Sequence, residues 1–132
     1  MSVEGMDNSV LGLVDSGSER TIIAPWMGRL IGLYPNAAAA SIPLGMGGQT
    51  LPTALYHARI RLHAPEPRGV EFVEWETEIG VPTHWIAPVW QAILGGIGFF
   101  NRYTVTMHRD VQALVVEPFD TFEARFGIRL AQ

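Results

Sequence analysis

Asp15 is the residue whose surroundings most suggest chemistry, because it ends an apolar run and begins the segment Asp15-Ser16-Gly17-Ser18. Residues 11–14 are typical of a short buried strand. Ser-Gly-Ser is typical of a turn, since Gly adopts backbone angles that other residues avoid and Ser hydroxyls bond nearby backbone groups. The pattern therefore predicts a carboxylate at the mouth of a sheet, which is a costly position for a charge without compensating partners. An Asp that merely caps a turn is the alternative, and these residues alone leave both interpretations open.

A glycine-rich segment, Gly45-Met46-Gly47-Gly48, is the second candidate for a functional element. It lies between residues 41–44 and 51–54, which together predict a β-hairpin with a glycine tip. Pro43 and Pro52 each remove a backbone donor, so we expect these strands to lie at an edge with few partners. Such a hairpin is easily deformed and would suit a lid over a binding site. An ordinary surface hairpin is the alternative.

Two longer alternating segments predict the central strands of the fold. Residues 56–62 place Arg59 and Arg61 on one face, and residues 72–79 place Glu74 and Glu76 on one face. A short loop rich in Pro and Gly joins the segments, so we expect antiparallel pairing with arginines opposite glutamates. The adjacent apolar residues 72 and 73 interrupt the alternation and predict a bulge.

Smaller elements complete the predicted fold. Residues 24–30 predict one or two helical turns, and residues 103–107 and 111–116 predict a further hairpin. Residues 120–123 have the spacing of a capping box and predict a short C-terminal helix that stops at Gly127. We expect Phe122 and Phe126 of that helix to face the body of the protein.

The amino-acid composition excludes several classes of function. The 132 residues, 48% of them hydrophobic and 17% charged, predict a single globular domain over 1–132. The formal charge of −4 argues against a nucleic-acid binder, which would need a basic patch. The chain has no Lys and no Cys, which excludes Schiff-base lysines, thiol nucleophiles and thiolate metal sites. The four His residues lack the close spacing of metal ligands, so we expect no metal and no cofactor.

No segment predicts a membrane protein. Residues 1–5 have neither the basic nor the apolar region of a signal peptide. Residues 79–100 carry no Asp, Glu, Lys or Arg and are long enough to span a bilayer, but repeated Pro and Gly would interrupt a helix there. We therefore expect a cytoplasmic protein that does not contact a membrane.

Several of these segments, in this order, resemble the retropepsin-like, single-domain aspartic proteases of bacterial type. Leu13-Val14-Asp15-Ser16-Gly17-Ser18 resembles the active-site signature of that family, and residues 44–50 resemble its glycine-rich flap. Ile93-Leu94-Gly95 resembles the motif that opens the family's single helix. Gly98-Phe99-Phe100-Asn101-Arg102-Tyr103 is similar to a bacterial variant, with Asn101 in place of the usual acid. The likeness extends over nearly the whole chain.

This resemblance implies an all-β, mostly antiparallel fold: a closed β-barrel of the acid-protease half, with a short helix after residues 93–95. It also implies an endopeptidase in which two carboxylates share one proton across a water molecule. Asp15 is the one Asp of this chain followed by Ser/Thr-Gly, so the second carboxylate is expected from a second copy of the chain. We therefore expect a homodimer that is best active at acid to mildly acidic pH.

The resemblance also assigns roles around Asp15. Ser16 would hydrogen-bond across the two-fold axis, Gly17 would admit the partner's backbone, and Ser18 completes the active-site turn. Met46, Gly47 and Gly48 would close over an extended peptide that binds as an added strand. Apolar pockets for its side chains are expected at Ile22, Leu44, Met46, Pro82 and Ile93.

A non-catalytic module that keeps this fold for dimerisation or peptide binding is the alternative, because fold does not fix function. Asn101 in place of an acid favours it, as do the spacing around Gly96 and Ile97 and an N-terminal strand that looks abbreviated.

Overall fold

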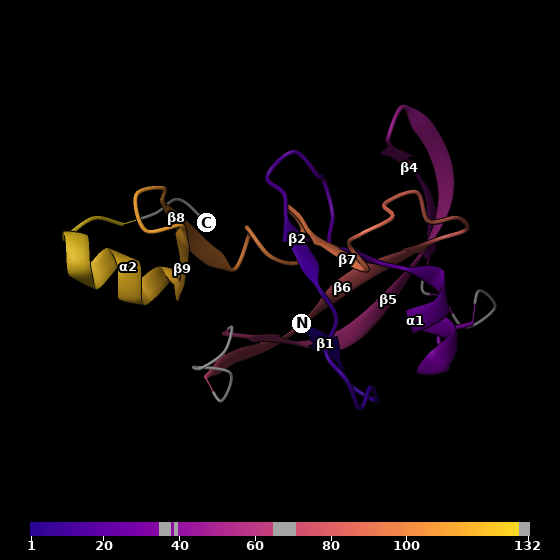
Figure 1. The fold of residues 1–132 in the computed structure, drawn as a ribbon, viewed down its shortest axis with the longest axis horizontal. Helices are drawn as coiled ribbons and strands as arrows, with labels where there is room; N and C mark the ends of the chain where they lie inside the picture. The colour runs from indigo at the N-terminus through magenta and orange to yellow at the C-terminus, as the bar shows by residue number, and fades with distance from the viewer. Residues whose placement is uncertain (35–37, 39, 65–70, 130–132) are drawn as a thin grey trace.

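The computed structural model describes residues 1–34, 38, 40–64 and 71–129. Its centre is a seven-stranded sheet, and a separate two-stranded sheet follows it in the chain (Figure 1). The order in the larger sheet is β1 (Ser2–Val3), β5 (Gln49–His63), β6 (Phe72–Pro82), β3 (Ile22–Ile23), β7 (Ala92–Leu94) and β2 (Gly12–Val14), and β4 (Ala40–Met46) also pairs with β5. The mostly β character predicted from the sequence is confirmed.

The closed barrel that the resemblance implies is wrong for this structure. Among the described residues the sheet runs from β1 to β2, and no pairing joins these two strands. β1 has two residues and β2 has three, so neither offers enough backbone groups to close the sheet on itself. The sheet is open.

The long ribbon of β5 and β6 has the predicted antiparallel register. Arg59 lies opposite Glu76 and Arg61 opposite Glu74, and both pairs form ion pairs, at 2.7 and 2.6 Å. The predicted bulge is wrong, because the pairing continues one residue for one residue to the end of the ribbon. Phe72 instead lies on the charged face, where the Arg61 guanidinium stands 4.3 Å from its ring centroid.

The main core lies against the opposite face of this ribbon. Tyr56, Ile60 and Ile79 point into it from the strands and are nearly inaccessible to solvent. Phe99, fully buried, and Trp75 extend the core, and the Trp75 indole N–H donates to the Gly98 carbonyl at 2.7 Å. Burial of these large side chains, each contributing roughly 2–3 kcal/mol, is the main stabilising term.

The two buried tyrosines should make the folded protein less stable at alkaline pH. Burial raises the pKa of Tyr56 and of Tyr103 above the usual phenol value. The folded chain therefore keeps these protons where the unfolded chain releases them, so the free energy of unfolding falls as the pH rises past about 10. Urea denaturation between about pH 9 and about pH 11 should show this loss. It should be smaller in Tyr103→Phe and unchanged in Tyr34→Phe, whose side chain is 55% exposed; equal losses in both variants would contradict the assignment.

Helix α1 (Pro25–Leu30) forms where residues 24–30 predicted helical turns, with Pro in its first turn. The helix expected after Ile93-Leu94-Gly95 is absent, and residues 96–102 form successive turns instead. The backbone N–H groups of Gly96 and Ile97 donate to the carbonyls of Ser18 and Glu19, outside the segment. Gly98 has φ +100°, which interrupts a right-handed helix. Long-range hydrogen bonding therefore replaces the predicted helix.

The C-terminal part consists of strands β8 (Tyr103–His108) and β9 (Ala113–Pro118) and helix α2 (Phe119–Phe126), which lie together on the left of Figure 1. The hairpin, the helix and its stop at Gly127 are confirmed. The capping box is wrong, since the helix begins at residue 119 and no side chain caps it. Phe122 and Phe126 do not face the body: their rings pack on each other at 4.8 Å, and Phe126 is 57% exposed.

Neither helix of the described residues has the length and apolar character needed to cross a membrane. Residues 79–100, which resemble a span in composition, instead form the end of β6, a loop, β7 and turns.

Candidate functional site

Asp15 lies on the turn that leaves β2 and returns to the sheet at β3. Because β7 lies between β2 and β3, this turn must pass over the end of β7. β2 pairs with β7 in parallel, and the Asp15 N–H donates to the Leu94 carbonyl at 3.0 Å. In Figure 1 the turn and the hairpin of β4 and β5 both reach the upper edge of the molecule. The topology thus presents Asp15 at the sheet end, as the sequence predicted.

The turn is fixed from below by the segment that follows β7. Gly95 N–H donates to the Thr21 hydroxyl at 3.1 Å, and Thr21 N–H donates to the Ile97 carbonyl at 2.8 Å. Gly96 N–H donates to the Ser18 carbonyl at 2.9 Å. These bonds join residues more than seventy positions apart, so tertiary structure holds the Asp15 turn in addition to the turn's own local hydrogen bonds.

The four predicted active-site residues differ in exposure and partners. Asp15 is partly buried, and its Oδ1 accepts the Gly17 N–H at 2.9 Å. Ser16 and Gly17 are exposed at the tip of the turn. The Ser18 hydroxyl donates to the Arg20 carbonyl at 2.8 Å. The structure therefore brings a carboxylate to a turn whose tip faces outward, and no ion pair within the described residues neutralises it.

An apolar cluster lies beside the turn, under the hairpin. Its buried members come from the hairpin (Leu44, Met46 and Leu51) and from the sheet beside Asp15 (Ile22 and Ile93). Leu13 also packs on it from β2. The predicted lid residue Met46 and the predicted pocket residue Ile93 are therefore in one cluster. Pro82, also predicted there, is buried where β6 pairs with Thr53.

Gly47 and Gly48 form the predicted hairpin tip, both with positive φ. A Cβ on Gly47 would overlap Ile86 Cδ1, whereas a Cβ on Gly48 would meet no atom within 4 Å. The tip therefore rests on Ile86, in the loop between β6 and β7. That loop is held by the Trp85 indole N–H, which donates to the Trp90 carbonyl at 2.8 Å.

We expect Gly47→Ala to lower the free energy of unfolding by about 1–2 kcal/mol, because Ala strains a left-handed backbone and displaces Ile86. Urea denaturation of this variant and of Gly45→Ala measures the effect. Gly45 lacks a positive φ and has open space around it, so its substitution should change the stability by less than about 0.5 kcal/mol. Equal losses in both variants would show that the tip does not rest on the loop.

Three residues of the site were not predicted. Thr21 is fully buried, and its hydroxyl accepts a hydrogen bond from the Gly95 N–H. In the sequence, a Thr just before a buried strand is only a weak signal for this role. Arg20 forms an ion pair with Glu78 of β6, and its Nε is buried without a partner. Ile86 gives no signal, because nothing in the sequence relates its loop to the hairpin tip.

Asn101, whose identity departs from the resembled family, has a structural role here. Its side-chain oxygen accepts the Gly98 N–H at 3.0 Å. A carboxylate could accept the same hydrogen bond. This departure therefore does not by itself argue against catalysis.

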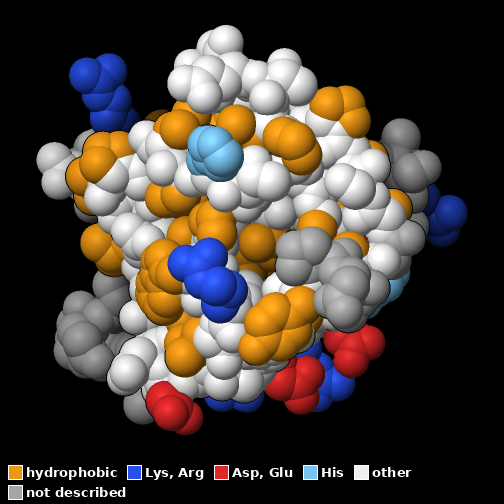
Figure 2. Space-filling view, turned by 90° about the vertical axis from the view of Figure 1, so that its right-hand side faces the viewer, with side chains coloured by type: hydrophobic (Ala, Val, Ile, Leu, Met, Phe, Trp, Pro, Cys, Tyr) orange, Lys and Arg blue, Asp and Glu red, His pale blue; other side chains and the backbone are white. Residues whose placement is uncertain are grey.

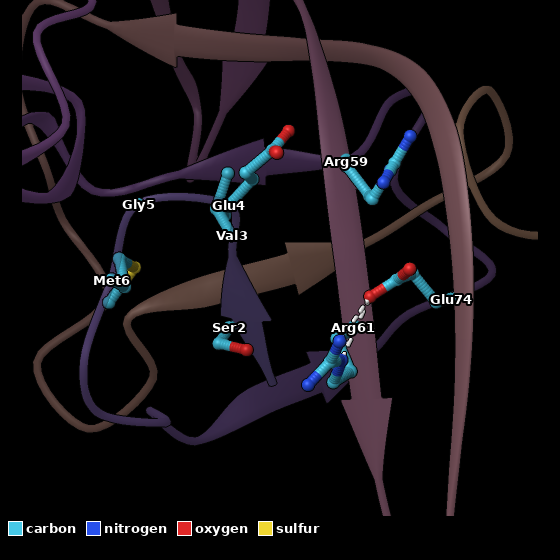
Figure 3. A pocket seen from close by; sticks show the side chains of 8 residues that line it. All are labelled: Ser2, Val3, Glu4, Gly5, Met6, Arg59, Arg61 and Glu74. Atoms are coloured by element: carbon cyan, nitrogen blue, oxygen red, sulfur yellow. Dashed lines mark hydrogen bonds and ion pairs between the residues drawn. The ribbon is translucent and has the colours of Figure 1, made fainter.

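A separate polar hollow of about 270 Å³ lies where β1 meets the charged face of β5 and β6 (Figure 3). Arg59, Arg61 and Glu74 line it together with residues 2–6. Each guanidinium already bonds a glutamate, and the hydrogen bond to Glu76 raises the pKa of Arg59 above its ordinary value. The charges in this hollow compensate one another and leave little uncompensated charge to attract a ligand. Among the described residues no group of His, Asp and Glu could hold a metal ion.

Comparison of this chain with protein-family models, with curated proteins and with solved structures finds no match.

Proposed function

We propose that this chain is an aspartic endopeptidase whose active site forms between two copies of the chain, each contributing Asp15. The observation that carries the proposal is the placement of Asp15: a partly buried carboxylate on a turn fixed from β7, beside an apolar cluster covered by a hairpin. A carboxylate that merely capped a turn would need neither the long-range support nor the adjoining apolar cluster.

The chemistry follows from two carboxylates in close contact. Two negative charges that close repel each other strongly, so the pair holds one proton between its two carboxyl groups. The ionised carboxylate takes a proton from a water molecule, and the oxygen of that water attacks the scissile carbonyl carbon. The protonated carboxyl gives its proton to the carbonyl oxygen. The resulting tetrahedral species breaks its C–N bond as the nitrogen accepts a proton, which releases an acid and an amine.

Two features favour a second copy of the chain as the source of the other carboxylate. Ser16 and Gly17 are exposed at the turn tip, where a partner could approach. Leu11, just before β2, is 65% exposed although apolar. A two-fold axis beside the turn would bring both Asp15 residues together and cover these residues.

The substrate that suits this arrangement is an extended peptide. It would lie between the turn and the hairpin and pair with backbone groups at the hairpin tip. Its apolar side chains would occupy the space around Ile22, Met46 and Ile93, which form one cluster. Met46 must move for this to happen, since it is 9% exposed and packed in that cluster.

The test is digestion of a denatured protein at acid to mildly acidic pH, with new peptides identified by mass spectrometry. We expect the rate per chain to rise with protein concentration until dimerisation, followed by sedimentation velocity, is complete. Absence of cleavage at concentrations where the dimer is fully formed would overturn the proposal.

A peptide-binding module without catalysis is the second candidate, and the departures from the resembled protease fold favour it. The sheet is open, and the helix expected after residues 93–95 is absent from the described residues. Peptides retained by the dimer but recovered intact would support this function over the enzyme.

A further inference from the structure

A second cavity, of about 360 Å³, lies between α1 and the core-facing side of β5 and β6. Pro25 and Arg29 line it from the helix, Ala54 and Tyr56 from β5, and Val81 from β6. Its lining does not include Asp15 or the hairpin tip. The volume is at the lower end of the range of small-molecule sites.

The charges around this cavity are unbalanced. Arg29 is the one charged residue among the described residues that line it, and no acid lies among them. Arg29 is exposed, and within the described chain its guanidinium has neither a hydrogen bond nor an ion pair. Figure 2 views the molecule from the side of α1: hydrophobic side chains spread over it, a basic side chain lies among them, and acidic side chains gather along the lower edge.

Tyr56 supplies a second polar group to the same cavity. Its side chain is 4% exposed, and its hydroxyl has no hydrogen-bond partner among the described residues. The hydroxyl is nevertheless not sealed in the core, because Arg20 Nε is the one described side-chain nitrogen or oxygen atom that is both fully buried and unpartnered. Tyr56 is among the residues that line the cavity. A buried hydroxyl without a protein partner is available to a ligand.

We propose that this cavity binds a small organic carboxylate with an apolar body, held by Arg29 and the Tyr56 hydroxyl. The guanidinium would donate a bidentate pair of hydrogen bonds to the carboxylate, and the phenol would donate one more. The apolar body would contact Pro25, Ala54 and Val81. A single cation in an apolar lining matches one negative charge, whereas a phosphate carries more charge and needs more donors. The proposal does not depend on the proposed peptidase activity.

Two sources could supply this chemistry: a free aryl or alkyl acid, or the C-terminal carboxylate of a short apolar peptide. The probes are therefore 3-phenylpropanoate with its neutral amide, and N-acetyl-Ala-Phe with its C-terminal amide. Titration followed by amide chemical shifts should show the changes centred on Ala54, Tyr56 and Val81. For ligands of this size we expect a Kd of about 1 mM.

We expect each acid that binds to do so at least about tenfold more tightly than its amide. Arg29→Gln should weaken the acid by about tenfold and Tyr56→Phe by about threefold, because each removes donors to the carboxylate. Arg109→Gln, the same change at an exposed residue of the β8–β9 turn, should leave the affinity unchanged. Thermal midpoints check that each variant is folded.

The outcomes separate the sources and test the site. Binding of 3-phenylpropanoate alone assigns a free acid, and binding of the dipeptide alone assigns a peptide terminus. Equal affinity for acid and amide, an unaltered affinity in Arg29→Gln, shifts centred elsewhere, or no saturation with either acid would overturn the proposal.

Discussion

Asp15→Asn is expected to reduce peptide cleavage by a factor of about 10³ or more. The amide cannot take a proton from water or share one with the opposite carboxylate, so both halves of the acid–base step are lost. The turn itself should survive, because the Asn side-chain oxygen can accept the Gly17 N–H that Asp15 Oδ1 accepts at 2.9 Å. The measurement is the cleavage rate of one identified peptide bond by variant and wild type at equal dimer concentration.

Asp110→Asn is the matched control, since Asp110 lies exposed in the β8–β9 turn and the charge change is the same. Its cleavage rate should equal that of the wild type. Mixed dimers extend the test. When wild-type and Asp15→Asn chains have fully exchanged between dimers, a dimer that contains one chain of each kind should be inactive. An Asp15→Asn protein that remains dimeric and cleaves at the wild-type rate would remove Asp15 from the mechanism.

Gly95→Ala is expected to lower the free energy of unfolding by about 2–3 kcal/mol or more. Gly95 is buried under the Asp15 turn, and a Cβ there would overlap the Arg20 carbonyl and stand 2.8 Å from the Ser18 carbonyl oxygen. Backbone atoms cannot rotate away as a side chain would, so the turn must lift. Urea denaturation measures the loss.

Gly12→Ala is the control for this substitution, because Gly12 lies on β2 and a Cβ there meets its nearest atom at 3.6 Å. Its stability should change by less than about 0.5–1 kcal/mol. If Gly95→Ala lost no more stability than Gly12→Ala, the turn would not be packed against residue 95 as described. Cleavage by Gly95→Ala should also fall, since the same contact holds Asp15 in place.

The elements that were predicted correctly are those whose pattern is local. Alternation over residues 56–62 and 72–79 predicted the β5–β6 ribbon and its arginine–glutamate pairs, and the prolines and glycines of residues 41–54 predicted the β4–β5 hairpin. The position of Asp15 on a turn followed from Ser-Gly-Ser in the same way. Each of these signals lies within a few residues of the structure that it predicts.

The features that were missed are set by distant residues. Nothing local in Ala92-Ile93-Leu94 shows that β7 lies between β2 and β3, and the resemblance predicted a helix after it. The N–H groups of Gly96 and Ile97 bond carbonyls of residues 18 and 19, and this competing partner replaces the helix. The contact between Ile86 and Gly47 likewise depends on the path that the loop between β6 and β7 takes through space.

The bond between Gly95 and Thr21, which spans 74 residues, also bears on how the protein folds. Closing a chain segment of that length is entropically costly and slows folding relative to the hairpins, whose contacts are near in sequence. The β4–β5 and β5–β6 hairpins should therefore gain protection from hydrogen exchange before the amide of Asp15 does. During synthesis, the Asp15 turn cannot reach this arrangement until residues 92–97 have left the ribosome.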